Sequence, residues 1–327
     1  MATMTALGER TVGGRWPGYL LRRLTRLVVS IWVLVTASFF MIYLIPGDPV
    51  RAAMGMRASP EAVAARRAAL GLDDPIWSQY LHYLGNTVTG RFGTSIVTNV
   101  DVSQTIAQRL PATVEISVLA FLVVALIAVP LGLVAAVLTR GGRRPVLQLG
   151  FAGGTMIIAA IPDFLFAVVL VYLFAVQFGW LPVAGRGDLS SYILPVTALA
   201  ASPIGVLARI VRIETLSVLG EDFIRTARSK RLPARLIYLR HAMPNALTAT
   251  LTFGGILLTG LMAGTVLVEN VFAWPGLGTT IVQSIQQKDY PTAQAMVLVY
   301  GGLVLVVNLV VDLLLALLNP RTTLKET

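Results

Sequence analysis

The sequence predicts an all-α polytopic membrane protein with six transmembrane helices. Hydrophobic residues make up 56% of the chain and charged residues only 13%, whereas typical soluble proteins have roughly 45–50% and 25%. In addition, the chain contains six apolar, charge-poor stretches that approach or exceed the roughly 20 residues with which a helix crosses a bilayer. These stretches are residues 27–46, 116–139, 146–178, 193–208, 246–268 and 293–318.

Prolines and acidic residues interrupt some of these stretches. Pro162 lies in the third stretch, and Pro195 and Pro203 lie in the fourth. Because proline kinks or ends helices, these two stretches have the least defined boundaries. Asp163 crosses the third stretch and Asp312 crosses the sixth. An ionisable residue at membrane depth is a candidate functional group. For both aspartates we favour the alternative, a paired or interfacial structural carboxylate.

Basic residues mark one side of the predicted membrane as cytoplasmic. Lys and Arg are concentrated in segment 1–23, in the connection 140–144 and in segment 209–240. On the other side most basic residues lie in one long connection, 47–111, and long connections carry little weight in this rule. We therefore predict that both termini are cytoplasmic. These loops account for the formal net charge of +10, which in a soluble chain would suggest nucleic acid as a partner.

The segment 47–111 is too long for a simple connection between two spans. Residues 60–70 and 76–88 have the patterns of two short helices, the second with spaced apolar and aromatic side chains. We therefore predict a small folded cap outside the membrane. The predicted organisation is a cytoplasmic segment 1–23, a first transmembrane helix 24–46, an extracytoplasmic cap 47–111, a five-helix core 112–319 with a cytoplasmic loop 214–245, and a cytoplasmic tail 320–327.

The most distinctive segment is the basic, amphipathic stretch 221–245. Residues 221–230 predict a short helix, because Glu221 and Asp222 lie at its positive N-terminal end and basic residues close its last turn. Pro233 is suited to begin a second helix. Taken alone, these residues are compatible with two functions: a basic loop held by anionic membrane lipid, or a docking device for a partner protein.

Small residues and one aromatic turn predict helix contacts rather than chemistry. Glycines four residues apart, at 150 and 154 and again at 260 and 264, have the spacing that lets membrane helices approach closely. The Trp-Pro-Gly-Leu-Gly sequence at 274–278 predicts a rigid turn. Its tryptophan is suited to the membrane interface.

Three motifs resemble the permease subunits of ABC importers, in the group that moves di- and oligopeptides, nickel chelates and related solutes. Phe223-Ile-Arg-Thr-Ala-Arg-Ser-Lys230, with Leu239-Arg-His-Ala242 after it, is similar to the cytoplasmic coupling loop of that family. Glu269-Asn-Val-Phe-Ala-Trp-Pro-Gly-Leu-Gly278 is similar to its second signature, and Pro46-Gly-Asp-Pro49 is similar to a motif of its cap. Arg231 stands where the family has a glycine. This departure leaves the shape of the turn open, because non-glycine residues disfavour positive φ.

The resemblance implies a type I ABC importer permease (MetI-like) bundle in the inner membrane of a prokaryote, with an extracytoplasmic insert after the first span. It implies that the chain forms half of a path for peptides or related small solutes. The implied partners are a second homologous permease subunit, two ATPase subunits that carry ATP and Mg, and an extracytoplasmic solute-binding protein.

The resemblance also assigns residues to two surfaces. In the ATPase-coupling loop, aromatic and apolar side chains would pack in a groove of the ATPase and basic side chains would make polar contacts. The residues concerned are Glu221, Phe223, Ile224, Arg225, Ala227, Arg228, Lys230, Arg231 and Leu232. On the side of the binding protein they are Glu269, Phe272, Trp274, Pro275, Gly276 and Gly278.

Motifs for catalysis or nucleotide binding are missing from the sequence. It has no Gly-x-x-x-x-Gly-Lys-Ser/Thr loop, no His-Glu-x-x-His, no Gly-x-Ser-x-Gly and no cysteine. We therefore predict no catalytic, cofactor or metal site in this chain. Two other classes remain as alternatives. A secondary transporter or channel would show repeated halves and coupling-ion carboxylates, and an intramembrane enzyme would need a reactive residue set; neither pattern is visible.

Overall fold

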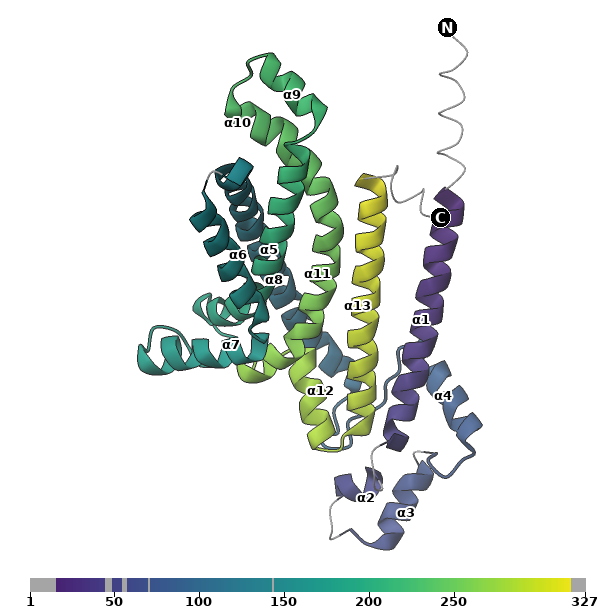
Figure 1. Ribbon diagram of the computed structural model, residues 1–327. Helices are drawn as coiled ribbons and strands as arrows, with labels where there is room; N and C mark the ends of the chain where they lie inside the picture. Colours follow the sequence, from purple (N-terminus) through teal and green to yellow (C-terminus); the bar gives the residue numbers. More distant parts are fainter. Residues whose placement is uncertain (1–15, 45–48, 55–57, 70, 143, 319–327) are drawn as a thin grey trace, which may run out of the picture. The chain divides into compact units, whose positions relative to one another are not determined.

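The computed structural model describes residues 16–44, 49–54, 58–69, 71–142 and 144–318, and in these residues it confirms the all-helical prediction (Figure 1). Within the same residues, extended pairing is limited to one isolated bridge between Thr94 and Asp101. The helices are α1 (Trp16–Leu44), α2 (Pro49–Met54), α3 (Pro60–Ala69), α4 (Ile76–Val88), α5 (Val102–Thr139), η1 (Arg140–Gly142), α6 (Pro145–Ala160), α7 (Asp163–Leu170), η2 (Val171–Gln177), α8 (Ser190–Val218), α9 (Asp222–Ser229), α10 (Ala234–Leu236), η3 (Ile237–Ala242), α11 (Met243–Val271), α12 (Leu277–Gln286) and α13 (Tyr290–Leu318).

Five of the described helices are long and apolar enough to cross a membrane, namely α1, α5, α8, α11 and α13. The third predicted stretch differs, because α6 and α7–η2 meet at an angle of 93°. A continuous third span over 146–178 is therefore wrong, and the bent pair takes its place as the sixth candidate. The break has a local cause. Ile161 is extended, with φ −78° and ψ 123°, as residues before proline prefer to be.

The spanning helices extend beyond the predicted boundaries. α5 begins at Val102 rather than at residue 116, so it includes the end of the predicted cap. α8 runs through Pro195 and Pro203 without ending, and both prolines are buried. The helix packs against α6, α7 and α11. The predicted end of the first span at residue 46, the segment 1–15 and the tail 320–327 lie outside the described residues.

The described residues form two compact units, of which the first lies within Met1–Tyr19, Glu115–Ala273 and Val307–Thr327. At two glycines outside the predicted four-residue spacing, its helices bring backbone close to backbone. A Cβ on Gly205 would lie 2.6 Å from the Thr155 carbonyl oxygen, and one on Gly132 would lie 2.5 Å from that of Ala208. Within this chain Gly150, Gly154 and Gly260 make no close helix contact, because a Cβ at each would have nothing within 4 Å, whereas a Cβ on Gly264 would lie 3.2 Å from Asp163 Oδ2.

The second unit lies within Leu20–Val114 and Trp274–Val306. It contains the cap helices α3 and α4, which confirm the two short helices predicted at 60–70 and 76–88. Leu277 and Met296 belong to its buried core. Two tyrosines attach α4 to α1. Tyr80 shares a hydrogen bond of 2.8 Å with Thr36, and the Tyr83 hydroxyl donates a hydrogen bond of 3.2 Å to the Ser38 hydroxyl.

Candidate functional site

The short helix α9 forms where the sequence predicts it. Glu221 is its N-cap and Lys230 its C-cap, so acidic side chains lie at the positive helix end and basic ones near the negative end. Asp222 pairs with Arg225 at 3.2 Å, but both side chains are more than three-quarters exposed. Such a solvated pair contributes little to stability. Together with α10, the helix forms the tip of the α8–α11 pair (Figure 1).

Arg231 adopts the left-handed conformation that glycine normally supplies at the end of a helix, with φ 53°. Its N–H donates to the Arg228 carbonyl at 2.8 Å, and the Leu232 N–H donates to the Ala227 carbonyl at 3.3 Å. These two bonds make a Schellman motif with Arg231 at its left-handed position. The turn therefore keeps the geometry expected of glycine, although this backbone conformation costs an L-residue about 1–2 kcal/mol.

The inner face of α9 packs against the chain itself. Ile224 is 0% exposed and Ala227 is 6% exposed, and both belong to a buried cluster with Leu219, Ile237 and Ala242. The expected packing of Ile224 and Ala227 in a partner groove is therefore corrected. These residues attach α9 to the end of α8 and to η3, which continues into α11.

The outer face of α9 is basic and carries one large apolar side chain. Phe223 is 43% exposed, and Arg225, Arg228, Lys230 and Arg231 are exposed around it. Segment 221–245 contains six Lys or Arg residues against two acidic residues. An exposed aromatic ring among cations suits an acidic, partly apolar protein groove.

Two arginines tie this region to the end of α5. Arg140 donates to the Leu219 carbonyl at 3.0 Å, and Arg212 of α8 donates twice to the Thr139 hydroxyl, at 3.1 and 2.9 Å. Sequence reasoning missed both roles and used these arginines only to assign the cytoplasmic side. The only available signal was that both arginines lie on the predicted cytoplasmic side, where the basic loop also lies.

The Trp-Pro-Gly turn is a buried clamp rather than an exposed surface. Trp274 is 0% exposed, and its indole N–H donates to the Ala112 carbonyl at 3.0 Å. The Leu277 N–H donates to the Thr113 hydroxyl at 2.8 Å. Trp274 is therefore held by the protein itself, and its side chain has no surface free for lipid. Glu269 and Phe272 are also buried, at 0% and 2% exposure. Their side chains therefore do not present a surface to a binding protein. Of the other predicted residues, Pro275 is half-buried, and Gly276 and Gly278 are buried.

The two aspartates within the predicted spans occupy separate positions in the first unit. Asp163 is half-buried at the start of α7, where its Oδ2 lies 3.2 Å from the place of a Cβ on Gly264. Asp312 is half-buried in α13, and its backbone carbonyl accepts a hydrogen bond of 3.2 Å from Tyr19. Among the described residues no three His, Cys, Asp or Glu side chains gather as metal ligands.

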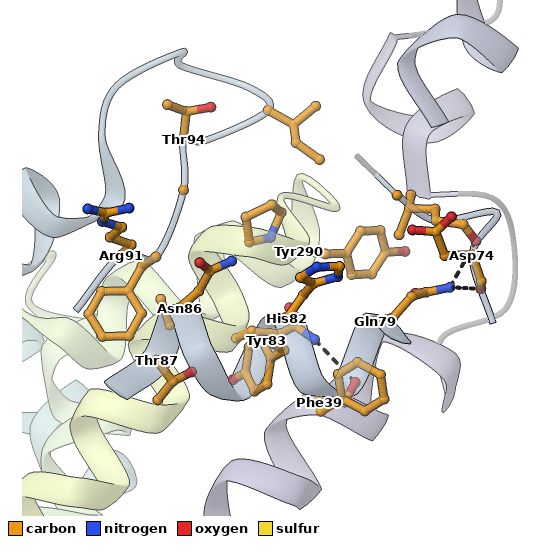
Figure 2. A pocket seen from close by; sticks show the side chains of 18 of the residues that line it. Phe39, Asp74, Gln79, His82, Tyr83, Asn86, Thr87, Arg91, Thr94 and Tyr290 are labelled. Carbon is orange, nitrogen blue, oxygen red and sulfur yellow. Dashed lines mark hydrogen bonds between the residues drawn. The ribbon is translucent and has the colours of Figure 1, made fainter. Parts of the chain in front are cut away.

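A cavity of about 560 Å³ lies in the second unit (Figure 2). Side chains of α4 form one wall. The rest of the lining comes from α1, the end of α3 and the connection to α4, the loop after α4 and the start of α13. Phe39 and Tyr290, which are 5% and 2% exposed, supply buried aromatic surface. Burial raises the pKa of the Tyr83 phenol, so this lining group remains neutral. The sequence gives no signal for the cavity, because its lining comes from segments far apart in the chain.

A buried carboxylate fixes the loop that borders this cavity. Asp289 is 4% exposed and accepts hydrogen bonds from the Ser95 hydroxyl at 2.5 Å, the Ile96 N–H at 3.1 Å and the Thr292 hydroxyl at 2.7 Å. Hydrogen bonds to an ionised acceptor are stronger than those between neutral groups. Asp289 therefore holds the loop after α4 against the start of α13.

Comparison with known proteins identifies the family. Residues 128–324 match the family described as binding-protein-dependent transport system inner membrane component, and residues 18–117 match the corresponding N-terminal membrane-component family. The chain is 36% identical over 308 residues to the glutathione transport system permease protein GsiC of Salmonella choleraesuis (strain SC-B67). It is 34% identical to the protein of that name from Escherichia coli (strain K12). Each alignment covers 94% of this chain and 99% of the relative.

A crystal structure of an amino acid ABC transporter with histidines has a TM-score of 0.46 and 19% identity, covering 67% of this chain and 94% of that one. The family models together extend over most of the sequence, and the relatives align along nearly their whole length. The chain therefore belongs to the family of binding-protein-dependent transport system inner membrane components, as a membrane-spanning permease subunit of an ABC importer.

Proposed function

We propose that α9 is the element through which an ATPase subunit drives this permease. The observation that carries the proposal is the division of α9 into two faces. Ile224 and Ala227 are buried in a cluster shared with α8 and η3, while Phe223 and the basic side chains remain exposed. A helix that is fixed to two spans on one face and open on the other is suited to transmit a push from a partner.

In this mechanism Phe223 enters an apolar recess of the ATPase, and Arg225 and Arg228 pair with acidic groups at its rim. Closure of the ATPase pair on ATP displaces α9. Because packed protein interiors deform little, the buried cluster carries the displacement to α8 and α11. The hydrogen bond from Arg140 to Leu219 carries it to the end of α5. ATP and Mg bind to the partner subunits, and this chain contributes motion rather than catalysis.

The proposed assembly contains this chain, a second homologous permease subunit, two ATPase subunits and an extracytoplasmic solute-binding protein. α9 and both termini face the cytoplasm, and the cap helices α3 and α4 face the opposite side. The excess of basic residues around α9 and Arg140 supports this orientation, since short cytoplasmic loops are enriched in Lys and Arg. The two permease subunits each form half of the solute path.

The proposed solutes are small peptides and related molecules. The relatives named above are glutathione transport permeases, and glutathione is a peptide-like solute. Selection by the binding protein precedes transport, so the solutes of this importer are tested with that protein present.

The coupling proposal is tested with the complete importer in lipid vesicles. Replacing exposed side chains of α9, by Phe223→Ala and separately by Arg228→Glu, is expected to lower ATP-driven uptake about tenfold or more, as for loss of a central interface residue. Insertion of the chain should persist, because neither side chain is buried. Arg144→Glu is the matched control, since Arg144 is an exposed arginine before α6. Unchanged uptake in both α9 variants would refute the proposal.

A further inference from the structure

The cavity in the second unit has no role in the coupling mechanism, yet it has the features of a ligand site. Its volume of about 560 Å³ lies within the roughly 300–1,000 Å³ of small-molecule pockets. We propose that it binds a short peptide of about three residues with free termini, at a site formed by the cap and the adjoining parts of α1 and α13. This proposal rests on the proposed function only in taking peptides as the solute class.

The length of the cavity matches such a peptide. Gln79, Tyr83 and Thr87 lie on the face of α4 that lines it, and the eight helical steps from residue 79 to residue 87 advance about 12 Å at 1.5 Å per step. An extended peptide of three residues measures about 10–11 Å. A tripeptide lying along α4 therefore occupies the face from end to end.

Oppositely charged side chains lie beyond the two ends of this face of α4. Figure 2 shows Arg91 beyond one end of the row of α4 side chains and Asp74 beyond the other. In the part of the chain that the structure describes, neither of these charged side chains has a hydrogen bond or ion pair. Arg91 is suited to the C-terminal carboxylate of a peptide, and Asp74 to its ammonium group. The arrangement selects a zwitterion over a molecule with one charge.

Uncommitted polar groups and aromatic rings lie between the charges. Within the described residues the side chains of His82 and Asn86 also have no hydrogen-bond partner, and both line the cavity. An amide side chain offers two donors and an acceptor to peptide groups. Phe39 and Tyr290 are 5% and 2% exposed, so they support the wall from behind and offer little surface to a ligand. Convergent polar groups are typical of ligand pockets.

The walls are held by contacts that do not need a ligand. Tyr43 donates to the Gln79 side chain at 2.7 Å, and Gln79 in turn donates to the backbone carbonyls of Leu72 and Asp74 at 3.1 and 2.8 Å. On the other side, Asp289 fixes the loop that bears Ile96. A preformed site loses less conformational entropy on binding than a mobile one.

The test measures binding of trialanine to the full-length chain in lipid nanodiscs, without ATPase or binding protein, by saturation-transfer NMR. Trialanine is expected to bind about tenfold more tightly than N-acetyl-trialanine amide, which lacks both terminal charges. Arg91→Glu and Asp74→Lys should each raise the dissociation constant about tenfold or more, as for loss of a charge-assisted hydrogen bond. Lys288→Glu and Glu61→Lys are charge-matched controls at exposed positions outside the lining, and should change it less than twofold.

Equal binding of the free and blocked peptides, or binding that survives both reversals, would overturn the proposal. A second arm adds the purified cognate binding protein. If the two reversals abolish its docking while trialanine does not bind, the cavity holds a segment of that protein and the proposal is wrong. Because this assay contains no ATPase, its failure leaves the Phe223 and Arg228 results intact, and failure of those leaves this assay intact.

Discussion

At the residue scale, Arg231 is the position where the chain departs most clearly from local preference. It holds φ 53° at the C-terminal turn of α9, and the two hydrogen bonds of the turn require that conformation. The exposed side chain receives no compensation from burial. The turn is therefore stabilised by its surroundings, in particular by Leu232, which packs against the cluster that holds Ile224.

Replacing this arginine by glycine should stabilise the turn. Arg231→Gly removes the steric cost of the left-handed conformation, partly offset by the greater backbone freedom of glycine in the unfolded loop, for a net gain of about 1 kcal/mol. Hydrogen exchange at the Leu232 amide should slow about fivefold. Lys230→Gly is the control, because Lys230 has φ −75° and gains no relief. Faster exchange in Arg231→Gly than in the parent chain would contradict the strain argument.

The helix containing these residues could be predicted, but its buried face could not. Charges at both ends and apolar residues at helical spacing predict residues 221–230, and α9 agrees with that range. The same spacing places Phe223 beside Ile224 without saying what covers each of them. Burial of Ile224 depends on Leu219 and Ile237, which reach it only through the tertiary fold. A local pattern in the sequence therefore identifies the helix, whereas identifying which side of it faces a partner requires the structure.

At the element scale, close helix packing in the first unit depends on individual glycines rather than on a repeated motif. α6 and α8 approach at Gly205, where the nearest atom to an added Cβ is a backbone oxygen of Thr155. The residues with four-residue spacing in α6, Gly150 and Gly154, face open space. Spacing along one helix fixes which residues share a face, but not which face meets a neighbour.

The 93° bend between α6 and α7–η2 could not be predicted either. Pro162 predicts that the helix breaks there, but it does not predict the angle of the break.

A methyl group at this contact should therefore be destabilising. Gly205→Ala places a Cβ 2.6 Å from the Thr155 carbonyl oxygen, so α6 and α8 must move apart, at a cost of about 1–3 kcal/mol for an overpacked site. The midpoint of thermal unfolding in detergent should fall. Gly154→Ala, in α6 and with nothing within 4 Å, should leave the midpoint unchanged or raise it, because alanine favours helix. Equal effects of the two substitutions would contradict this packing.

At the scale of the whole molecule, composition and hydropathy predict the class of protein, and local patterns predict the cap. The helices expected at 60–70 and 76–88 appear as α3 and α4, because proline, acidic residues and spaced aromatics specify them locally. The cavity beside α4 was not predictable, since Phe39 and Tyr290 meet there from distant parts of the chain. Orientation in the membrane follows from the distribution of basic residues and remains a proposal, as does the contact of α9 with an ATPase.

Site-directed cross-linking tests that contact most directly. The chain has no cysteine, so Phe223→Cys creates a single thiol, which is loaded with a maleimide–benzophenone reagent in membranes that contain the complete importer. Val88→Cys, at a cap residue that is 85% exposed, is the control. We predict that light joins Phe223→Cys, and not Val88→Cys, to an ATPase subunit, and that a membrane-impermeant maleimide labels only Val88→Cys in intact cells. Labelling of Phe223→Cys from outside the cell, or no ATPase product from it, would contradict the account.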